Sequence, residues 1–276
     1  MSLKEEIAVR SLSFEILIPN CYQIKLLMTF ILHINVTETS YLDATRLIRL
    51  WADTSESRYV CFANVHVLME AWDSPDFREI LNHADLVTPD GMPLVWAMHL
   101  KGQSDQTRVY GPTLMLYALE AASQGQIPVG FYGGAPEVLG LLVERMRARY
   151  AGLNVVFSMS PPFQEVRQEE ENEIVEKINE SGARILFVGL GCPKQEIWMA
   201  EHRGRVNAVM LGVGAGFDFH AGVKPQAPVW MQRIGLEWLF RLASEPRRLW
   251  RRYLYHNPRF VVLAAADLLG LLREPR

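Results

Sequence analysis

Residues 86–92 combine a short apolar run with a single carboxylate, in the order Leu-Val-Thr-Pro-Asp-Gly-Met. If the run is a buried strand of an open α/β sheet, Asp90 lies at its carboxyl end, where such sheets bind their ligands. A lone acid in that position could act as a general base. Pro-Asp-Gly is also favourable turn chemistry, because Pro presets φ, Asp bonds nearby backbone and Gly accepts a positive φ. An ordinary turn is therefore the competing interpretation.

A polar pair, Asn64 and His66, follows the strand-like run 59–63 and comes just before a helical stretch. Polar side chains between a strand end and a helix start can face a ligand. The alternatives are a helix cap for Asn64 and a half-buried, hydrogen-bonded imidazole for His66. The polar loop 101–110 carries Arg108 close to the proposed base. That loop could close over a substrate or could be an ordinary surface connection.

Glycine-containing turns follow three further predicted strands, at 133–134, at 191–196 and at 212–216. Each turn precedes a predicted helix, so that backbone N–H groups and the positive end of the helix could bind a phosphate. We therefore expect Gly133, Gly134, Gly191 and Lys194 to help bind a nucleotide or a sugar nucleotide. Close packing between strands and helices also needs glycine and is the alternative.

Motifs for other nucleotide and metal sites are incomplete. A dinucleotide site needs G-x-G-x-x-G and an acid about 20 residues later. Here Lys194 stands in place of the third glycine, and the strand after 133–134 ends in Ser-Met-Ser. An NAD-dependent oxidoreductase is therefore the weaker alternative. The chain has no P-loop motif, no H-x-x-x-H or H-x-H pair and no Asp-x-Asp pair, so we expect no bound metal and no other cofactor.

Strands and helices are predicted to alternate along most of the chain. The expected strands are 30–36, 59–63, 86–90, 127–132, 154–159, 184–190 and 208–213, and the expected helices are 40–51, 67–72, 74–82, 92–100, 111–123, 136–150, 169–181 and 196–203. This order predicts an α/β, Rossmann-like fold with a largely parallel sheet and helices on both faces. Residues 1–27 show no clean periodicity and form an N-terminal extension of uncertain order. The catalytic domain is assigned to residues 28–224.

The composition describes a globular chain whose C-terminal part is basic. The 276 residues are 49% hydrophobic and 21% charged, which is enough to bury a sizeable core. The net charge is −3, but residues 225–276 contain nine Arg and no Lys against four acids, a balance of +5, which leaves −8 for residues 1–224. Three scattered cysteines fit neither a disulfide framework nor a Cys-rich zinc site and indicate a cytoplasmic protein.

The basic segment 225–276 interleaves arginines with aromatic and aliphatic residues at helical spacing. A helical appendage of this kind suits an anionic membrane surface, where each basic residue adds about 1 kcal/mol. Nucleic acid is a less favoured partner, because the rest of the chain is acidic and contains no known nucleic-acid-binding fold. The alternative is an ordinary helical cap whose aromatic residues belong to the core. The apolar stretch 260–272 is too short to span a membrane.

A series of short motifs occurs in order between residues 29 and 262. They are Asn64-Val-His66, Thr88-Pro-Asp90-Gly-Met92, Phe131-Tyr-Gly-Gly134, Val188-Gly-Leu-Gly-Cys-Pro-Lys-Gln-Glu196, Gly214-Ala-Gly-Phe-Asp218, Gly235-Leu-Glu-Trp-Leu-Phe-Arg241, Glu245-Pro-Arg-Arg248 and Arg252-Tyr. Together they resemble the WecG/TagA/CpsF family of bacterial glycosyltransferases. Many relatives carry Thr two residues before the Asn of the first motif, where this chain has Phe62. A role for that hydroxyl therefore does not carry over, and the donor sugar stays open.

The resemblance implies an inverting, metal-independent transfer of N-acetylmannosamine, its uronic acid or glucose from a UDP-sugar. The implied acceptor is an undecaprenyl-diphosphate-linked saccharide of surface polysaccharide assembly, such as exopolysaccharide or teichoic acid. Asp90 would be the base, with Asn64 and Gln195 as catalytic or donor contacts and Asp218 as a nucleotide contact.

The resemblance also implies a peripheral protein on the inner face of the plasma membrane. The acidic remainder of the chain leads us to expect no nucleic-acid partner. The appendage would contact the acceptor or the membrane through Arg241, Arg247, Arg248, Arg251 and Arg252. A homo-oligomer is possible. A non-catalytic nucleotide-binding protein at the membrane is the alternative from another class.

Overall fold

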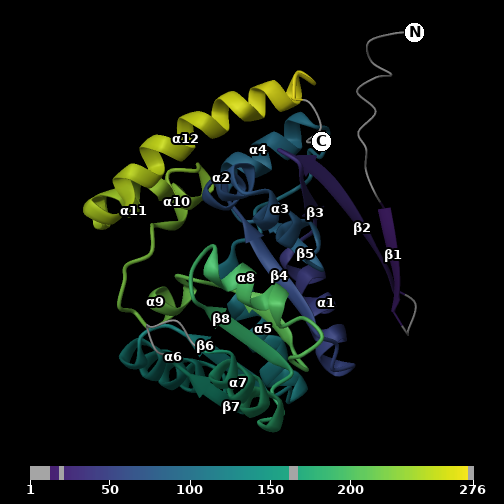
Figure 1. The fold of residues 1–276 in the computed structure, drawn as a ribbon, viewed down its shortest axis with the longest axis vertical. Helices are drawn as coiled ribbons and strands as arrows, with labels where there is room; N and C mark the ends of the chain where they lie inside the picture. Colours follow the sequence, from purple (N-terminus) through teal and green to yellow (C-terminus); the bar gives the residue numbers. More distant parts are fainter. Residues whose placement is uncertain (1–12, 19–21, 162–166, 273–276) are drawn as a thin grey trace.

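The computed structural model describes residues 13–18, 22–161 and 167–272, and its centre is a six-stranded parallel sheet (Figure 1). The strand order across this sheet is β5 (Leu86–Pro89), β4 (Arg58–Ala63), β9 (Val209–Gly212), β8 (Ile185–Gly189), β6 (Val129–Gly133) and β7 (Val155–Met159). Parallel strands need crossover connections, and helices supply them here. The predicted α/β fold with a parallel sheet is confirmed.

Helices cover both faces of the sheet, because residues along each strand alternate between two apolar cores. In β4, Tyr59 and Cys61 face one core, whereas Val60 and Phe62 face the other. The Tyr59 face is covered by α2 (Val65–Asp73), α3 (Pro75–Asn82), α4 (Met92–Leu100), α7 (Gln168–Glu180) and α8 (Lys194–Glu201). The Val60 face is covered by α1 (Tyr41–Asp53), α5 (Gly111–Gly125), α6 (Pro136–Arg149) and α9 (Gly216–His220). Each helix predicted between residues 40 and 203 is present.

An antiparallel sheet precedes the parallel one. It consists of β1 (Ser13–Ile18), β2 (Tyr22–Ile31) and β3 (Ile34–Glu38). The prediction of one strand over 30–36 is wrong, because the chain reverses at Leu32 and His33, whose φ angles are 48° and 67°. Both turn residues thus have the positive φ of a tight hairpin turn, without the Asn or Gly that usually marks one. The uncertain order expected for 1–27 falls partly on residues 1–12 and 19–21, which lie outside the described residues.

The C-terminal segment forms three helices, α10 (Val229–Arg233), α11 (Glu237–Ser244) and α12 (Pro246–Leu268). Figure 1 shows α12 lying across the end of the molecule beside α2 and α4. Phe260 of α12 is 4% exposed and belongs to the same core as α2 and α3. Asp267 accepts a hydrogen bond from the Leu32 backbone N–H at 3.2 Å and pairs with Lys101, directly after α4, at 3.0 Å. No helix within the described ranges is both long and apolar enough to cross a membrane.

Candidate active site

The carboxyl ends of the parallel strands and helices α10–α12 enclose a cavity of about 950 Å³. Segments from the whole chain contribute to its wall. The strand ends supply Asn64, Asp90, Gly134, Gly191 and Gly214, the loops supply Arg108 and Lys224, α9 supplies Asp218, and the appendage supplies Glu237, Arg241, Arg248 and Arg252. The cavity therefore brings together most of the site residues predicted from the sequence.

Asp90 lies directly after β5, at the floor of this cavity, and is 8% exposed. Its backbone N–H donates to the Ala63 carbonyl at 2.8 Å, which holds the turn against the end of β4. Burial raises the pKa of Asp90 to about 6; Arg108 opposes this rise, and Glu237 adds to it. A carboxylate with a raised pKa binds a proton more tightly than a solvated one and is a better base near neutral pH. The ordinary-turn interpretation does not account for this burial.

Arg108 lies between two carboxylates, Asp90 and Glu237. Its guanidinium donates to Glu237 Oε2 at 2.7 Å but reaches Asp90 Oδ1 only at 3.4 Å. The Arg108 Nε–H also donates to the Asp90 backbone carbonyl, and the guanidinium lies 4.0 Å from the centre of the Tyr110 ring. The Tyr110 hydroxyl in turn donates to Glu237 Oε1 at 3.0 Å. Glu237 of the appendage therefore takes the stronger contact with Arg108, and Asp90 keeps the weaker one.

Asn64 combines a structural role with a contact to the candidate base. As the residue before α2, it accepts hydrogen bonds from the backbone N–H groups of His66 at 3.1 Å and Val67 at 3.3 Å. Its amide nitrogen donates to Asp90 Oδ2 at 3.4 Å. The helix-cap interpretation is thus confirmed, and the amide of the same side chain is oriented towards Asp90.

Gln195 lines the cavity, but its amide is fully engaged with neighbouring groups. Its nitrogen donates to the Gly212 carbonyl at 2.6 Å and to Glu196 Oε1 at 2.8 Å, and its oxygen accepts from the Gly191 N–H at 3.2 Å. Gln195 therefore ties the turn after β8 to the end of β9. Glu196 is 1% exposed, and burial raises its pKa to about 7.

The glycine turns pack closely, and their N–H groups already have partners. The Gly134 N–H donates to the Gly189 carbonyl at 3.1 Å, and the Gly191 N–H is used by Gln195. A Cβ on Gly133 would lie 2.6 Å from the Gly189 backbone. Gly133 and the exposed Lys194 are outside the cavity wall. These contacts favour the packing interpretation of the glycines. The charge of a bound phosphate would therefore be neutralised mainly by side chains.

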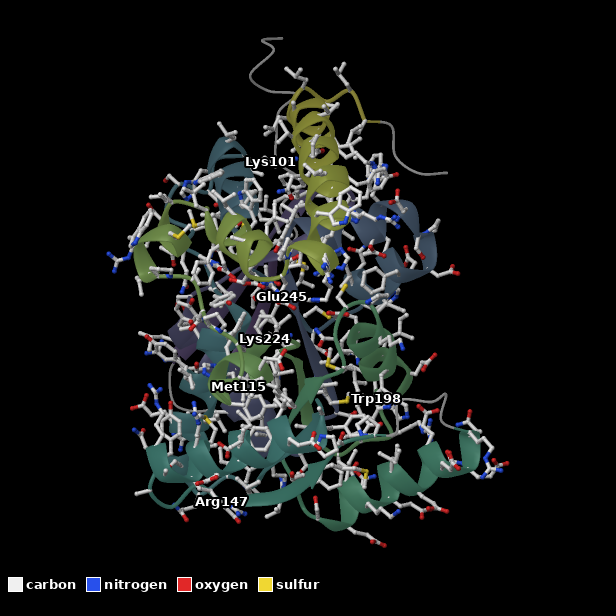
Figure 2. The ribbon with its side chains drawn as sticks, turned by 90° about the vertical axis from the view of Figure 1, so that its left-hand side faces the viewer. Lys101, Met115, Arg147, Trp198, Lys224 and Glu245 are labelled. Atoms are coloured by element: carbon white, nitrogen blue, oxygen red, sulfur yellow. The ribbon has the colours of Figure 1, made fainter. Side chains whose placement is uncertain are left out.

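Asp218 lies in the cavity wall and pairs with Lys224 at 2.8 Å. Lys224 also approaches Glu245 of the appendage at 3.6 Å, and Figure 2 shows both residues close together beneath the appendage helices. Glu245 in turn receives two hydrogen bonds of 2.7 Å from Arg248. This series of charged contacts links α9 to the start of α12.

The five arginines predicted for the appendage divide into two groups. Arg241, Arg248 and Arg252 line the cavity, whereas Arg247 and Arg251 are exposed on the outer side of the appendage. Arg241 and Arg252 form no ion pair with a carboxylate in the described part of the chain, and Arg241 Nε is buried without a hydrogen-bond partner there. Burial, together with the nearby Arg241 and Arg248, lowers the pKa of Arg252. Two uncompensated guanidinium groups in one cavity indicate an anionic ligand.

Comparison with known proteins identifies the family of this chain. Residues 29–274 match the model of the "Glycosyl transferase WecG/TagA/CpsF family". The chain belongs to this family of glycosyltransferases. One relative is 31% identical over 229 residues, covering 83% of this chain and 82% of its own length. It is the N-acetylglucosaminyldiphosphoundecaprenol N-acetyl-beta-D-mannosaminyltransferase of Bacillus spizizenii.

Phe62 stands where the resemblance to the family leads us to expect a threonine. The Phe62 ring is 5% exposed and packs against Gly111, where an added Cβ would lie 3.0 Å from the ring. Phe62 also contributes to the cavity wall. An apolar ring therefore forms this part of the cavity wall.

Proposed function

We propose that this glycosyltransferase moves a sugar from a UDP donor to an undecaprenyl-diphosphate-linked saccharide, with N-acetylmannosamine as the first candidate sugar and N-acetylglucosamine as the acceptor sugar. The name of the Bacillus spizizenii relative supports both sugars. The observation that carries the proposal is the buried Asp90 facing a cavity that also contains the uncompensated Arg241 and Arg252. The uronic acid and glucose are the remaining candidates for the donor sugar.

Asp90 takes the proton of the acceptor hydroxyl in the proposed reaction. The acceptor oxygen attacks the anomeric carbon as the bond from that carbon to the UDP oxygen breaks, so the configuration inverts and UDP leaves. The proton stays on Asp90 until solvent removes it. Asn64 donates to the Asp90 carboxylate and keeps it oriented towards the acceptor.

Arg241 and Arg252 neutralise the charge that develops on the leaving diphosphate. Guanidinium groups donate paired hydrogen bonds to phosphate oxygens. The electrostatic attraction between the two groups is stronger inside a cavity that excludes water. Asp218 and Lys224 lie in the same wall, and we propose that they contact the nucleotide. With this positive charge supplied by side chains, the transfer step needs no catalytic metal or other cofactor.

The acceptor lipid is proposed to enter between α4 and α12. This end of the cavity is apolar and is formed by Leu100, Val261 and Leu268. The outer surface of α12 exposes Trp250 (46%) and Leu254 (64%) beside Arg247 and Arg251. Basic and apolar side chains in one helix surface suit an anionic membrane, so we place the protein on the cytoplasmic face of the membrane that holds its acceptor.

The function is tested by incubating the protein with a short-chain polyprenyl-diphosphate-linked N-acetylglucosamine and a series of UDP-sugars. UDP-N-acetylmannosamine is expected to release UDP and to extend the acceptor by one sugar. If only a different UDP-sugar extends the acceptor, the proposed reaction stands and that sugar is the donor. Binding of UDP without any extension would instead support the non-catalytic alternative, and a rise in melting temperature with NADH but not with UDP would support an oxidoreductase.

Glu237→Gln is expected to move the acid limb of the pH–rate profile to lower pH. Glu237 raises the pKa of Asp90, so removing its charge lets Asp90 stay ionised in more acidic solution. The maximal rate should also fall, because Arg108 loses its closest carboxylate and can pair more tightly with Asp90. The measurement is kcat/KM from about pH 5 to pH 8.

Glu245→Gln is the matched control for this prediction. Glu245 is also an appendage carboxylate, but it contacts Lys224 and Arg248 and not the Arg108–Asp90 pair. Its replacement should leave the acid limb in place. An unchanged acid limb in Glu237→Gln would show that Glu237 does not act on Asp90.

A further inference from the structure

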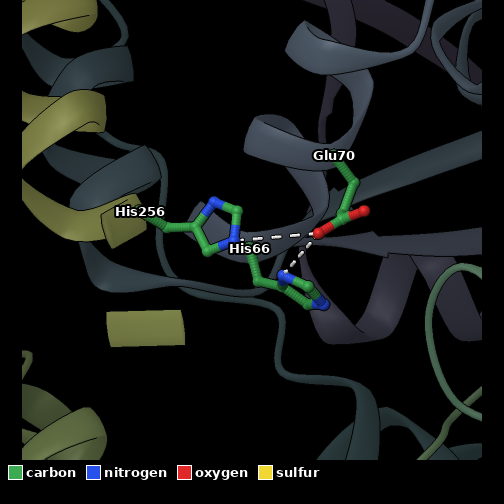
Figure 3. A group of neighbouring side chains, drawn as sticks. All are labelled: His66, Glu70 and His256. Atoms are coloured by element: carbon green, nitrogen blue, oxygen red, sulfur yellow. Dashed lines mark ion pairs between the residues drawn. The ribbon is translucent and has the colours of Figure 1, made fainter. Parts of the chain in front are cut away.

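His66, Glu70 and His256 form a cluster at the contact between α2 and α12 (Figure 3). Glu70 Oε1 lies 3.4 Å from His66 Nδ1 and 3.7 Å from His256 Nε2. Figure 3 shows the three side chains converging from the two helices. His66 and Glu70 are four residues apart on α2 and therefore share one helix face. None of the three has a role in the transfer proposed above.

We propose that His66, Glu70 and His256 bind a divalent transition-metal ion of the Zn²⁺ type that joins the appendage to the catalytic unit. Ligand atoms at about 2.1 Å from a tetrahedral ion lie about 3.4 Å from one another. The two distances from Glu70 are already close to that value, and the three candidate ligand atoms all lie within 4.8 Å of one another. A small movement of the imidazole rings would complete the geometry.

Hydrogen bonding does not explain this cluster. Among the described residues, the proposed ligand atom His66 Nδ1 is buried and has no hydrogen-bond partner. His256 is only 9% exposed. Buried polar atoms without partners are costly, and an ion that is not part of the chain is a common reason for them.

The protonation state of the cluster suits a metal. Burial, with Arg252 nearby, lowers the pKa of His66 to about 3, and burial also lowers the pKa of His256. Both rings are therefore neutral near pH 7, which is the form that binds metals, and the contacts with Glu70 are not ion pairs at that pH.

Ligand chemistry selects the type of ion. Two imidazoles and one carboxylate suit Zn²⁺ and its neighbours in the transition series, whereas Mg²⁺ and Ca²⁺ prefer oxygen ligands only. Arg252 and Arg241 face His66 and oppose any cation, and Arg259 near His256 is compensated by its pair with Asp73 at 2.6 Å. Selectivity therefore comes from the nitrogen ligands and not from a negative local field.

A bound ion would fix the position of α12. His256 is its only ligand from the appendage, and His66 and Glu70 lie in the helix that starts directly after Asn64. The ion would thus hold Arg252, one turn before His256, at the edge of the cavity. His66 and His256 both line the cavity, so a fourth coordination position is available to water or to an oxygen of a bound ligand.

The test measures metal binding and does not use sugar transfer. The full chain is freed of metal with a chelator, dialysed and titrated with ZnCl₂ by calorimetry, with MgCl₂ in parallel. One equivalent of Zn²⁺ and no Mg²⁺ should bind. Co²⁺ should give the visible absorption of a tetrahedral nitrogen and oxygen site. His256→Ala, His66→Ala and the nearly isosteric Glu70→Gln should each weaken Zn²⁺ binding by about 100-fold or more, because even residues outside the ligand set contribute about 10- to 100-fold.

Two control variants make the result specific. His83→Ala removes a histidine, directly after α3, that lies 3.7 Å from Glu79 four residues earlier and has no third candidate ligand among the described residues. Glu171→Gln disrupts the other cluster of candidate ligands, formed with Glu201 and His202. Both should bind Zn²⁺ as the wild type does. The proposal would be overturned if the wild type bound no Zn²⁺. It would also be overturned if His256→Ala and Glu70→Gln, shown to be folded by circular dichroism, bound Zn²⁺ as tightly as the wild type, or if the control variants lost binding instead.

Discussion

Asp90→Asn is expected to lower the rate of sugar transfer by about 10²- to 10⁴-fold, the usual contribution of a general base. Asparagine has nearly the same shape and can keep the contacts with Asn64 and Arg108, but it cannot accept the proton of the acceptor hydroxyl. The affinity for UDP should stay nearly unchanged. UDP release and calorimetric binding of UDP measure the two quantities separately. Retained transfer would exclude Asp90 as the base.

The same substitution should stabilise the protein at alkaline pH. The pKa of Asp90 is raised to about 6 in the folded chain, so an ionised Asp90 destabilises the fold above that pH and a protonated one does not. Asn carries no charge, and Asp90→Asn should therefore raise the free energy of unfolding at pH 8 by on the order of 1–3 kcal/mol. The gain should shrink as the pH falls from about 6 to 4. A loss of stability at pH 8 would show that Asp90 is mainly structural.

The double substitution of Arg241 and Arg252 by Ala should lower kcat/KM by about 10²- to 10⁴-fold. Both side chains line the cavity without a carboxylate partner among the described residues, so their charge is available to the diphosphate. UDP affinity should fall together with the rate. This joint loss distinguishes the arginines from Asp90, whose replacement leaves UDP binding nearly intact.

Replacing Arg247 and Arg251 by Ala is the matched control, since it also removes two arginines from the appendage. These side chains are exposed and lie outside the cavity. Transfer to a short-chain soluble acceptor should stay within about twofold, while binding to anionic liposomes should weaken by about 2 kcal/mol, or 1 kcal/mol for each basic residue. Equal losses of transfer in the two double variants would contradict the division of the arginines into two groups.

The sequence predicted the parts of the fold that local pattern controls. Six strands with apolar runs and the helices between them are present close to the expected positions, because periodicity of burial fixes both kinds of element. Asp90 was placed correctly, since the carboxyl ends of parallel strands gather at one edge of the sheet. The hairpin at Leu32 and His33 was missed, because neither residue is typical of a turn with positive φ.

Contacts between distant segments could not be predicted in the same way. Glu237 was part of a recognised motif, but its bond to Arg108 depends on how the appendage folds over the sheet. His66 and Glu70 share a helix, yet their proposed partner His256 comes from α12, so a search for metal ligands at local spacing could not find the cluster. The glycine turns lie at the predicted edge of the sheet. Their role differs from the predicted phosphate binding, because they pack closely and their N–H groups hydrogen-bond within the chain.

The most direct test of the proposed reaction follows the anomeric proton by NMR during transfer from UDP-N-acetylmannosamine to the short-chain N-acetylglucosamine acceptor. Wild-type protein should release one UDP for each sugar added, and the new bond should have the configuration opposite to that of the donor. Asp90→Asn should form almost no product under the same conditions. A product that retains the donor configuration, or equal product formation by Asp90→Asn, would contradict a single displacement assisted by Asp90.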